Sequence, residues 1–124
     1  LITLNVPSTL LPDANNQTII ATLLDNQNNI LSRNYFIEGE WKHKKLVSAK
    51  IEYQLTKNNS SDCLKLTTDN LAFFVDVQHP DYNFSDRGFI LLPGEEKILD
   101  ISSGAENIKL DLLEIYCLNN YLDK

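Results

Sequence analysis

Apolar and polar residues alternate in short segments along this chain, and this alternation limits the fold to one built mainly from strands. Residues 49–56 are the clearest case. Their apolar members occupy every second position: Ala49, Ile51, Tyr53 and Leu55. Because successive side chains of a strand point to opposite faces, this period of two predicts a strand with one face on a core and the other in water.

Several other segments have the length and composition of strands. They span residues 17–24, 30–37, 62–68, 71–78, 88–92, 96–101 and 108–118, and residues 2–6 are a further candidate. Runs rich in Asn, Asp, Ser, Pro or Gly separate them, as turns require. About seven to nine short strands in a chain of this length predict an antiparallel β-sandwich.

The segment 108–118 and the residues after it are open to two interpretations. A helical spacing relates Leu110, Leu113, Cys117 and Tyr121, so a short terminal helix is one alternative. We expect a strand, because β-branched and aromatic residues favour strands and no capping box precedes the segment.

Length and charge narrow the class of protein. The chain has 124 residues, which suits a single domain over residues 1–124. Its net charge is −6, from 17 acidic and 11 basic residues, with only Lys42, Lys44 and Lys45 clustered, so we expect no nucleic-acid partner. No segment has the ~18 consecutive apolar residues of a membrane span, so we expect no membrane partner. The pattern begins abruptly at Leu1, so we expect this chain to be a fragment of a larger multidomain protein.

The cysteines and histidines favour neither a disulfide nor a metal site. Cys63 and Cys117 each lie in an apolar strand pattern, where a free cysteine packs as a small hydrophobic residue. We therefore expect two buried thiols in preference to a disulfide. His43 and His79 are far apart in the sequence, and neither belongs to a ligand-spaced cluster, so we expect no metal and no cofactor.

Residues 71–95 are the most distinctive stretch: an apolar strand, a polar corner and a second strand. Pro80 ends the first strand, since proline cannot donate a hydrogen bond to a ladder. Asp86 is expected to accept hydrogen bonds from backbone amides two residues on. Gly88 permits a positive φ where the second strand begins, and residues 92–95 have the Pro-Gly sequence of a type II turn.

This stretch resembles the corner between two strands in the C-terminal immunoglobulin-like domain of β-mannosidases, the exo-glycosidases of glycoside hydrolase family two. The likeness lies in Phe84-Ser85-Asp86, the aromatic Phe89 and the run from Leu91 to Glu95. Arg87 departs from the family, which usually has Asn there. We assign a structural role at the corner to Phe84, Ser85, Asp86, Gly88, Pro93 and Gly94. A less specific likeness extends over about residues 17–118.

The resemblance implies an all-β, immunoglobulin-like sandwich of about seven to nine strands that acts as an accessory domain. The parent enzyme would hydrolyse terminal β-D-mannose residues of oligosaccharides with two glutamates of a (β/α)₈ barrel, so this chain would carry no catalytic residue. Its partners would be the other domains of the same polypeptide, the barrel included. A β-galactosidase or β-glucuronidase parent, a stand-alone carbohydrate-binding module and an adhesion-type sandwich are the alternatives. The Asn and Lys content suggests a bacterial protein, cytoplasmic or periplasmic.

The carboxylates of the chain offer no catalytic pair. A retaining glycosidase needs two carboxyl groups about 5–5.5 Å apart. Glu38 and Glu40 can share a strand face, and Glu95 and Glu96 are adjacent. Neither pair belongs to a motif that forms a pocket, so we expect no catalytic site in this chain.

The aromatic residues have two interpretations. If they are exposed together, a sugar-stacking platform would consist of Tyr35, Phe36, Trp41, Tyr82 and Phe84. We instead expect Tyr35, Phe36 and Phe84 in the core and Tyr82 half exposed in a loop. Direct carbohydrate binding is therefore not expected.

Phe74 is the candidate for a contact with another domain. Strand alternation places it with Ala72 and Asp76, on the face opposite Phe73, Val75 and Val77. An aromatic side chain on a face that would otherwise be polar often marks a contact surface. We expect Phe74, together with Trp41, to contact another domain of the polypeptide; the alternative is that a loop of this same domain covers Phe74.

Overall fold

The computed structural model describes residues 17–37, 39–103 and 107–122. The strand candidate 2–6 and Glu38 lie outside these residues. The chain divides into two compact units, Leu1–Lys45 and Leu46–Lys124. A single domain over residues 1–124 stays a prediction.

The first unit contains a β-hairpin of strands β1 (Ile19–Leu24) and β2 (Ile30–Phe36), which pair antiparallel. Asp25 stabilises the loop between them, because its Oδ1 accepts hydrogen bonds from the backbone N–H groups of Gln27 and Asn29, both at 2.8 Å. Asn28 has a positive φ of 63°, a conformation that asparagine tolerates in turns. A short 3₁₀ helix, η2 (Trp41–His43), follows.

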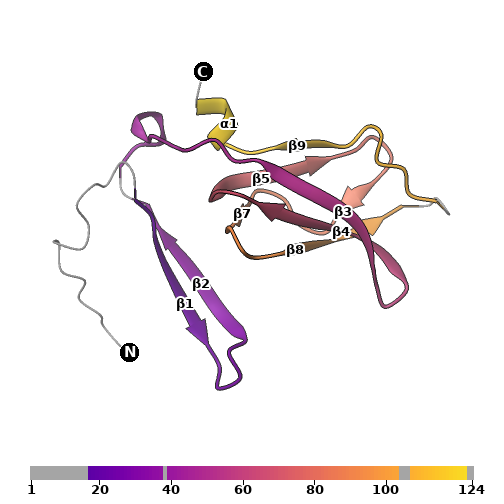
Figure 1. Ribbon diagram of the computed structural model, residues 1–124, viewed down its shortest axis with the longest axis horizontal. Helices are drawn as coiled ribbons and strands as arrows, with labels where there is room; N and C mark the ends of the chain where they lie inside the picture. The colour runs from indigo at the N-terminus through magenta and orange to yellow at the C-terminus, as the bar shows by residue number, and fades with distance from the viewer. Residues whose placement is uncertain (1–16, 38, 104–106, 123–124) are drawn as a thin grey trace. The chain divides into compact units, whose positions relative to one another are not determined.

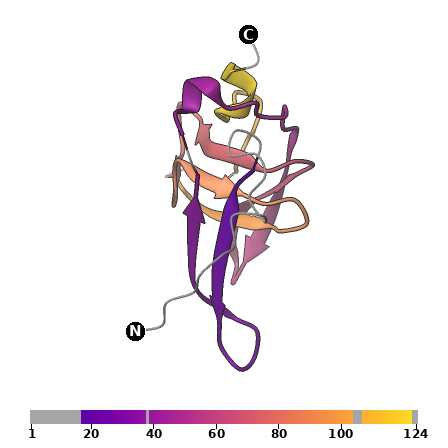
Figure 2. The ribbon, with the colours of Figure 1, turned by 90° about the vertical axis from the view of Figure 1, so that its left-hand side faces the viewer.

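The second unit is a sandwich of two antiparallel sheets (Figure 1 and Figure 2). One sheet has the order β3-β4-β8-β6 and the other the order β7-β5-β9. The strands are β3 (Ile51–Asn58), β4 (Ser61–Thr68), β5 (Ala72–Gln78), β6 (Asn83–Phe84), β7 (Phe89–Leu91), β8 (Lys97–Ser102) and β9 (Glu114–Tyr116), and helix α1 (Asn119–Leu122) follows β9. The predicted all-β, sandwich fold is confirmed, and every strand predicted within the described residues has a counterpart.

One apolar core lies between the two sheets. Leu64, Leu66 and Leu99 come from the first sheet and are fully buried, as is Val75 from the second. The other buried members of the cluster are Ala49, Ala72, Val77, Leu91 and Cys117. Burying a leucine side chain contributes roughly 1.5–3 kcal/mol, so these three leucines stabilise the sandwich more than any surface contact does.

The predicted alternation of residues 49–56 is correct in register and less complete in burial. Tyr53 pairs with Leu66 and Leu55 with Leu64, so both side chains lie on the core face of their sheet. Tyr53 is nevertheless 47% exposed and Leu55 38%. The reason is the position of β3 at the edge of its sheet, where it has a neighbouring strand on one side only.

A bulge in β5 changes the predicted faces of that strand. Ala72 pairs with Leu91 and Val75 with Phe89, so one more residue separates the pairs on β5 than on β7. The intervening Phe74 has a positive φ of 52°. Ala72 therefore joins Val75 in the core cluster, and its predicted place on the polar face is wrong. Its neighbour Phe73, predicted to share the face of Val75, is buried outside that cluster.

The chain from residue 108 onward mixes the two structures considered for it. Only Glu114–Tyr116 form a strand, β9, and the residues before it form turns and irregular structure. A single helical turn, α1, comes after the strand. The two-residue strand β6 has no counterpart in the sequence prediction, because a pair as short as Asn83 and Phe84 shows no periodicity.

Candidate functional site

The corner between β5 and β7 is tied to strands on both sides. The Oγ of Ser85 accepts a hydrogen bond from the Asp100 N–H at 2.9 Å, and the Ser85 N–H donates to the Asp100 carbonyl at 3.1 Å. The Gly88 N–H donates to the Val75 carbonyl at 2.8 Å. Ser85 therefore holds the corner to β8, and Gly88 holds it to β5.

Asp86 binds one backbone amide and one cation. Its Oδ1 accepts a hydrogen bond from the Arg87 N–H at 2.8 Å, one residue on and not two as the sequence prediction had it. Its Oδ2 lies 2.6 Å from the Nζ of Lys97 on β8. The hydrogen bond from Lys97 holds the pKa of the Asp86 carboxyl below its ordinary value. The same ammonium lies 4.9 Å from the ring centroid of Phe89, close enough for a cation–π contact.

Arg87 has a partner that the sequence analysis missed. Its Nε lies 2.9 Å from Asp76 Oδ1 and its terminal nitrogen 2.8 Å from Asp76 Oδ2, so the guanidinium binds the carboxylate at two points. This hydrogen bonding is the main reason why the pKa of Asp76 is lowered, and Gln78 adds a further hydrogen bond. Opposite charges 11 residues apart on the two sides of the corner were the only signal in the sequence.

The remaining corner residues shape the backbone or fill the core. Phe84 is half-buried and packs against the core cluster. Gly88 and Gly94 have positive φ values of 65° and 81°, and a Cβ at either position would meet no atom within 4 Å. Glycine is therefore required here by the backbone conformation and not by space. Pro93 and Gly94 form a tight turn that the hydrogen bond from the Glu95 N–H to the Leu92 carbonyl closes at 3.2 Å.

Tyr82 is buried, and its predicted half-exposure is wrong. Its hydroxyl oxygen accepts a hydrogen bond from the Lys109 N–H at 2.9 Å. Its ring stacks on that of His79, with the centroids 4.2 Å apart and the planes at 19°. His79 in turn uses Nδ1 to accept a hydrogen bond from the Asp81 N–H at 3.1 Å. These contacts stabilise residues 79–82, where the corner begins.

The five aromatic residues considered for a sugar platform divide between the two units. Tyr82 and Phe84 belong to the second unit and are engaged there as described above. Tyr35, Phe36 and Trp41 belong to the first unit. Phe36 is 57% exposed, so its predicted place in a core is wrong. The hairpin is a single layer of two strands, β1 and β2. Neither strand can cover a side chain, such as that of Phe36, which projects from the face of this layer.

Both cysteines are free and buried, as predicted. Cys117 belongs to the core cluster, whereas Cys63 lies outside it. The Cys63 thiol donates a hydrogen bond to Asp100 Oδ1 at 3.3 Å. Burial, together with this acceptor, raises the pKa of the Cys63 thiol and keeps it protonated. A protonated, buried thiol is a poor nucleophile.

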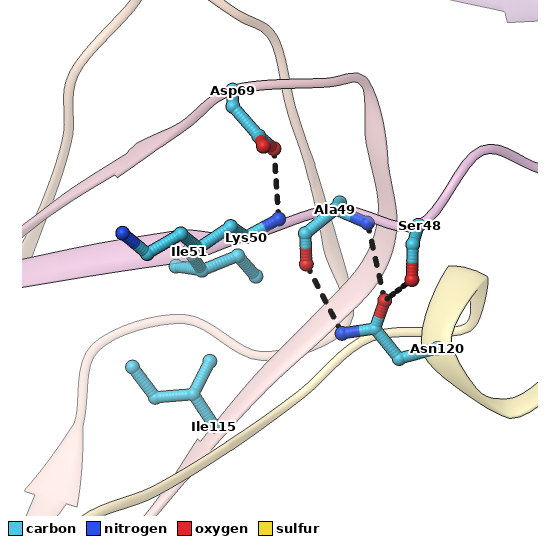
Figure 3. Close-up of a pocket in the computed structure, with 7 residues that line it drawn as sticks. All are labelled: Ser48, Ala49, Lys50, Ile51, Asp69, Ile115 and Asn120. Atoms are coloured by element: carbon cyan, nitrogen blue, oxygen red, sulfur yellow. Dashed lines mark hydrogen bonds between the residues drawn. The ribbon is translucent and has the colours of Figure 1, made fainter.

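A surface pocket of about 430 Å³ lies where the chain leads into β3 (Figure 3). The residues that line it are Ser48, Ala49, Lys50, Ile51, Asp69, Ile115 and Asn120. Two of its polar side chains bind backbone, and the other two bind side chains: Ser48 bonds to Asn120 and Lys50 to Glu52. Asp69 Oδ1 accepts a hydrogen bond from the Lys50 N–H at 2.7 Å, and the Asn120 amide bonds to Ala49. These hydrogen bonds fix the backbone of the segment that leads into β3. We therefore attribute the pocket to the course of this segment and not to a ligand site.

Among residues 17–37, 39–103 and 107–122, no group of three or more His, Cys, Asp and Glu side chains could hold a metal ion. No helix in the described part of the chain is long and apolar enough to cross a membrane.

Two antiparallel sheets around one core, joined by a hydrogen-bonded corner, define the second unit as an immunoglobulin-like β-sandwich domain. Residues 46–116 match the family model of the mannosidase Ig-fold domain, and the chain belongs to this family. The match begins at the first residue of the second unit. A search of curated proteins gave no match.

Proposed function

We propose that this chain is an accessory part of a β-mannosidase-like exo-glycosidase of glycoside hydrolase family two. The parent enzyme would release terminal β-D-mannose from oligosaccharides, with its catalytic glutamates on another domain. The observation that carries the proposal is the match of residues 46–116 to the mannosidase Ig-fold domain. Asp76 and Asp86 form ion pairs with Arg87 and Lys97. This pairing of the corner carboxylates is consistent with a structural role.

The proposed partners are other domains of the same polypeptide, and the proposed contact residues are Phe74 and Trp41. Phe74 is 45% exposed and has a positive φ, which costs a bulky residue roughly 1–2 kcal/mol. Strained residues cluster where the surrounding structure uses the side chain they present. A docking role for the Phe74 side chain accounts for both its strain and its exposure.

The activity is tested on the full-length parent protein and on the chain of residues 1–124. The parent should hydrolyse an aryl β-D-mannoside faster than the matching β-galactoside or β-glucuronide, and the chain alone should hydrolyse none of the three. Preference for another glycoside would replace the substrate, and a parent that has no glycosidase activity would overturn the proposal. Turnover by the chain alone that disappears in Glu40→Gln would show that this fragment is itself catalytic.

The contact is tested by Phe74→Ser in both proteins. The substitution should leave the melting temperature of the isolated chain nearly unchanged and lower the heat resistance of the full-length enzyme. Unfolding of the isolated chain would show that Phe74 belongs to the core. Micromolar binding of mannobiose by the isolated chain, measured by calorimetry, would favour a carbohydrate-binding module instead.

A further inference from the structure

Within the described residues, the segment that leads into the sandwich, residues 46–50, belongs to no ladder, and its last residue, Lys50, bonds to Asp69 directly after β4. Strand β3 begins at Ile51, and the ladder between β3 and β4 begins with the pair of Ile51 and Thr68. The lead-in segment directly follows residue 45, where the first unit ends. Ala49 is only 4% exposed, so its backbone groups need partners inside the protein.

Asparagine side chains supply these partners. Three consecutive carbonyl groups of the lead-in segment each accept a hydrogen bond from a different asparagine amide. Val47 binds Asn119 at 2.7 Å, Ser48 binds Asn70 at 3.0 Å, and Ala49 binds Asn120 at 3.0 Å. We call Asn70, Asn119 and Asn120 the asparagine clamp.

Asn120 takes the place of a neighbouring strand for Ala49. Its Nδ2 donates to the Ala49 carbonyl, and its Oδ1 accepts from the Ala49 N–H at 3.1 Å (Figure 3). The same oxygen accepts from Ser48 Oγ at 3.1 Å. A side-chain amide carries the same donor and acceptor as a peptide group, so it satisfies both backbone groups of one residue, as a paired strand does.

Asn119 joins the lead-in segment to a second element. It is only 1% exposed, and its Nδ2 donates to the Leu71 carbonyl at 2.8 Å as well as to Val47. Its Oδ1 accepts from the Phe73 N–H at 2.9 Å. Three of the four hydrogen bonds that an asparagine amide can make are therefore used within the protein.

We propose that the asparagine clamp is a conformational device. Through Asn119 and Asn120 it holds the lead-in segment to helix α1, and the segment can separate from this helix while the two sheets stay folded. The hydrogen bonds from the clamp side chains can break without breaking the ladder between β3 and β4. A segment held by few hydrogen bonds opens locally at a lower free energy than a sheet does. Two of the three clamp residues lie beyond the family match, which ends at residue 116. The order of the lead-in segment thus depends on the last residues of the described chain.

Hydrogen exchange of single amides, measured by NMR on the chain of residues 1–124, tests the proposal. Asn120→Ala removes the acceptor of the Ala49 amide, and exchange at Ala49 should become about tenfold faster or more. Asn120→Asp keeps that acceptor but replaces the donor to the Ala49 carbonyl with a second acceptor, so exchange at Ala49 should accelerate less than in Asn120→Ala. The Gly88 amide, which bonds to Val75, should be unchanged in both variants.

Trypsin gives a second reading. Cleavage after Lys50 should accelerate about tenfold in Asn120→Ala, while cleavage after Lys57, which lies within β3, should not change. Tyr121→Ala is the control on the same helix, because it leaves both clamp asparagines in place. A folded Asn120→Ala chain with wild-type exchange at Ala49 and wild-type cleavage after Lys50 would overturn the proposal. Global unfolding of this variant would also overturn it, since the segment would not open by itself.

Discussion

The bulge at Phe74 predicts that glycine and alanine will reverse their usual order of stability at this position. At φ +52°, any residue with a Cβ is strained by roughly 1–2 kcal/mol, whereas glycine is not. In an ordinary strand, glycine is less stable than alanine by about 0.5–1 kcal/mol because it loses more backbone entropy. The difference between the two terms leaves Phe74→Gly more stable than Phe74→Ala by about 0.7 kcal/mol.

Comparing two variants at one site isolates the effect of backbone conformation on stability, because both variants lose the same phenyl ring. For a domain of this size the difference corresponds to about 3–5 °C in melting temperature. Thermal unfolding of both chains, followed by circular dichroism, measures it. Gln78 is an exposed position of the same strand without a positive φ, so Gln78→Gly should be less stable than Gln78→Ala. A Phe74→Ala chain at least as stable as Phe74→Gly would refute the strain at Phe74.

Three further predictions concern the corner, the thiols and the core. Arg87→Asn should lower the melting temperature at pH 7, and the gap to wild type should shrink below about pH 4. The pKa of Asp76 is lowered in the folded chain, so the pair stabilises above the ordinary aspartate pKa and loses its effect as the carboxyl is protonated; a gap that does not depend on pH would contradict this. Cys63 and Cys117 should react slowly with a thiol reagent in the native chain, and both should react after denaturation. Leu64→Ala should destabilise the chain by about 2–5 kcal/mol in urea unfolding, and a cost below about 1 kcal/mol would contradict a fully buried site.

The strands could be predicted from the sequence because each depends on local alternation and on turn residues. Residues 49–56 show this, since the register of β3 with β4 follows the predicted faces. The exposure of Tyr53 could not be foreseen, because it depends on which strand lies at the edge of the sheet. The bulge was hidden for a related reason: a positive φ at a phenylalanine has no signature in the residue pattern.

The corner and the clamp differ in how far the sequence exposes them. The glycines and Pro93 have fixed backbone preferences, so their positions could be assigned from the residues alone. The partner of Arg87 could not, because an ion pair depends on how two strands meet. The clamp was missed altogether. Asparagine-rich composition does not indicate any specific contact, and the bonds of Asn119 and Asn120 span about 70 residues of sequence.

The bulge in β5 also bears on which changes of chain length this domain tolerates. It lets Ala72 and Val75 reach the same core although three positions separate them, which an unbroken strand does not allow. Deleting residue 74 would leave Ala72 and Val75 two positions apart, as Leu91 and Phe89 are on β7, so the strands could pair without a bulge and both side chains would stay on the core face. The turn at Asn59 and Ser60, which joins β3 to β4, is exposed, and both of its residues have a positive φ, 48° and 71°. A two-residue turn is already the shortest hairpin connection, so insertions between homologous domains are expected at that turn, and within β5 the expected change is loss of the bulge residue.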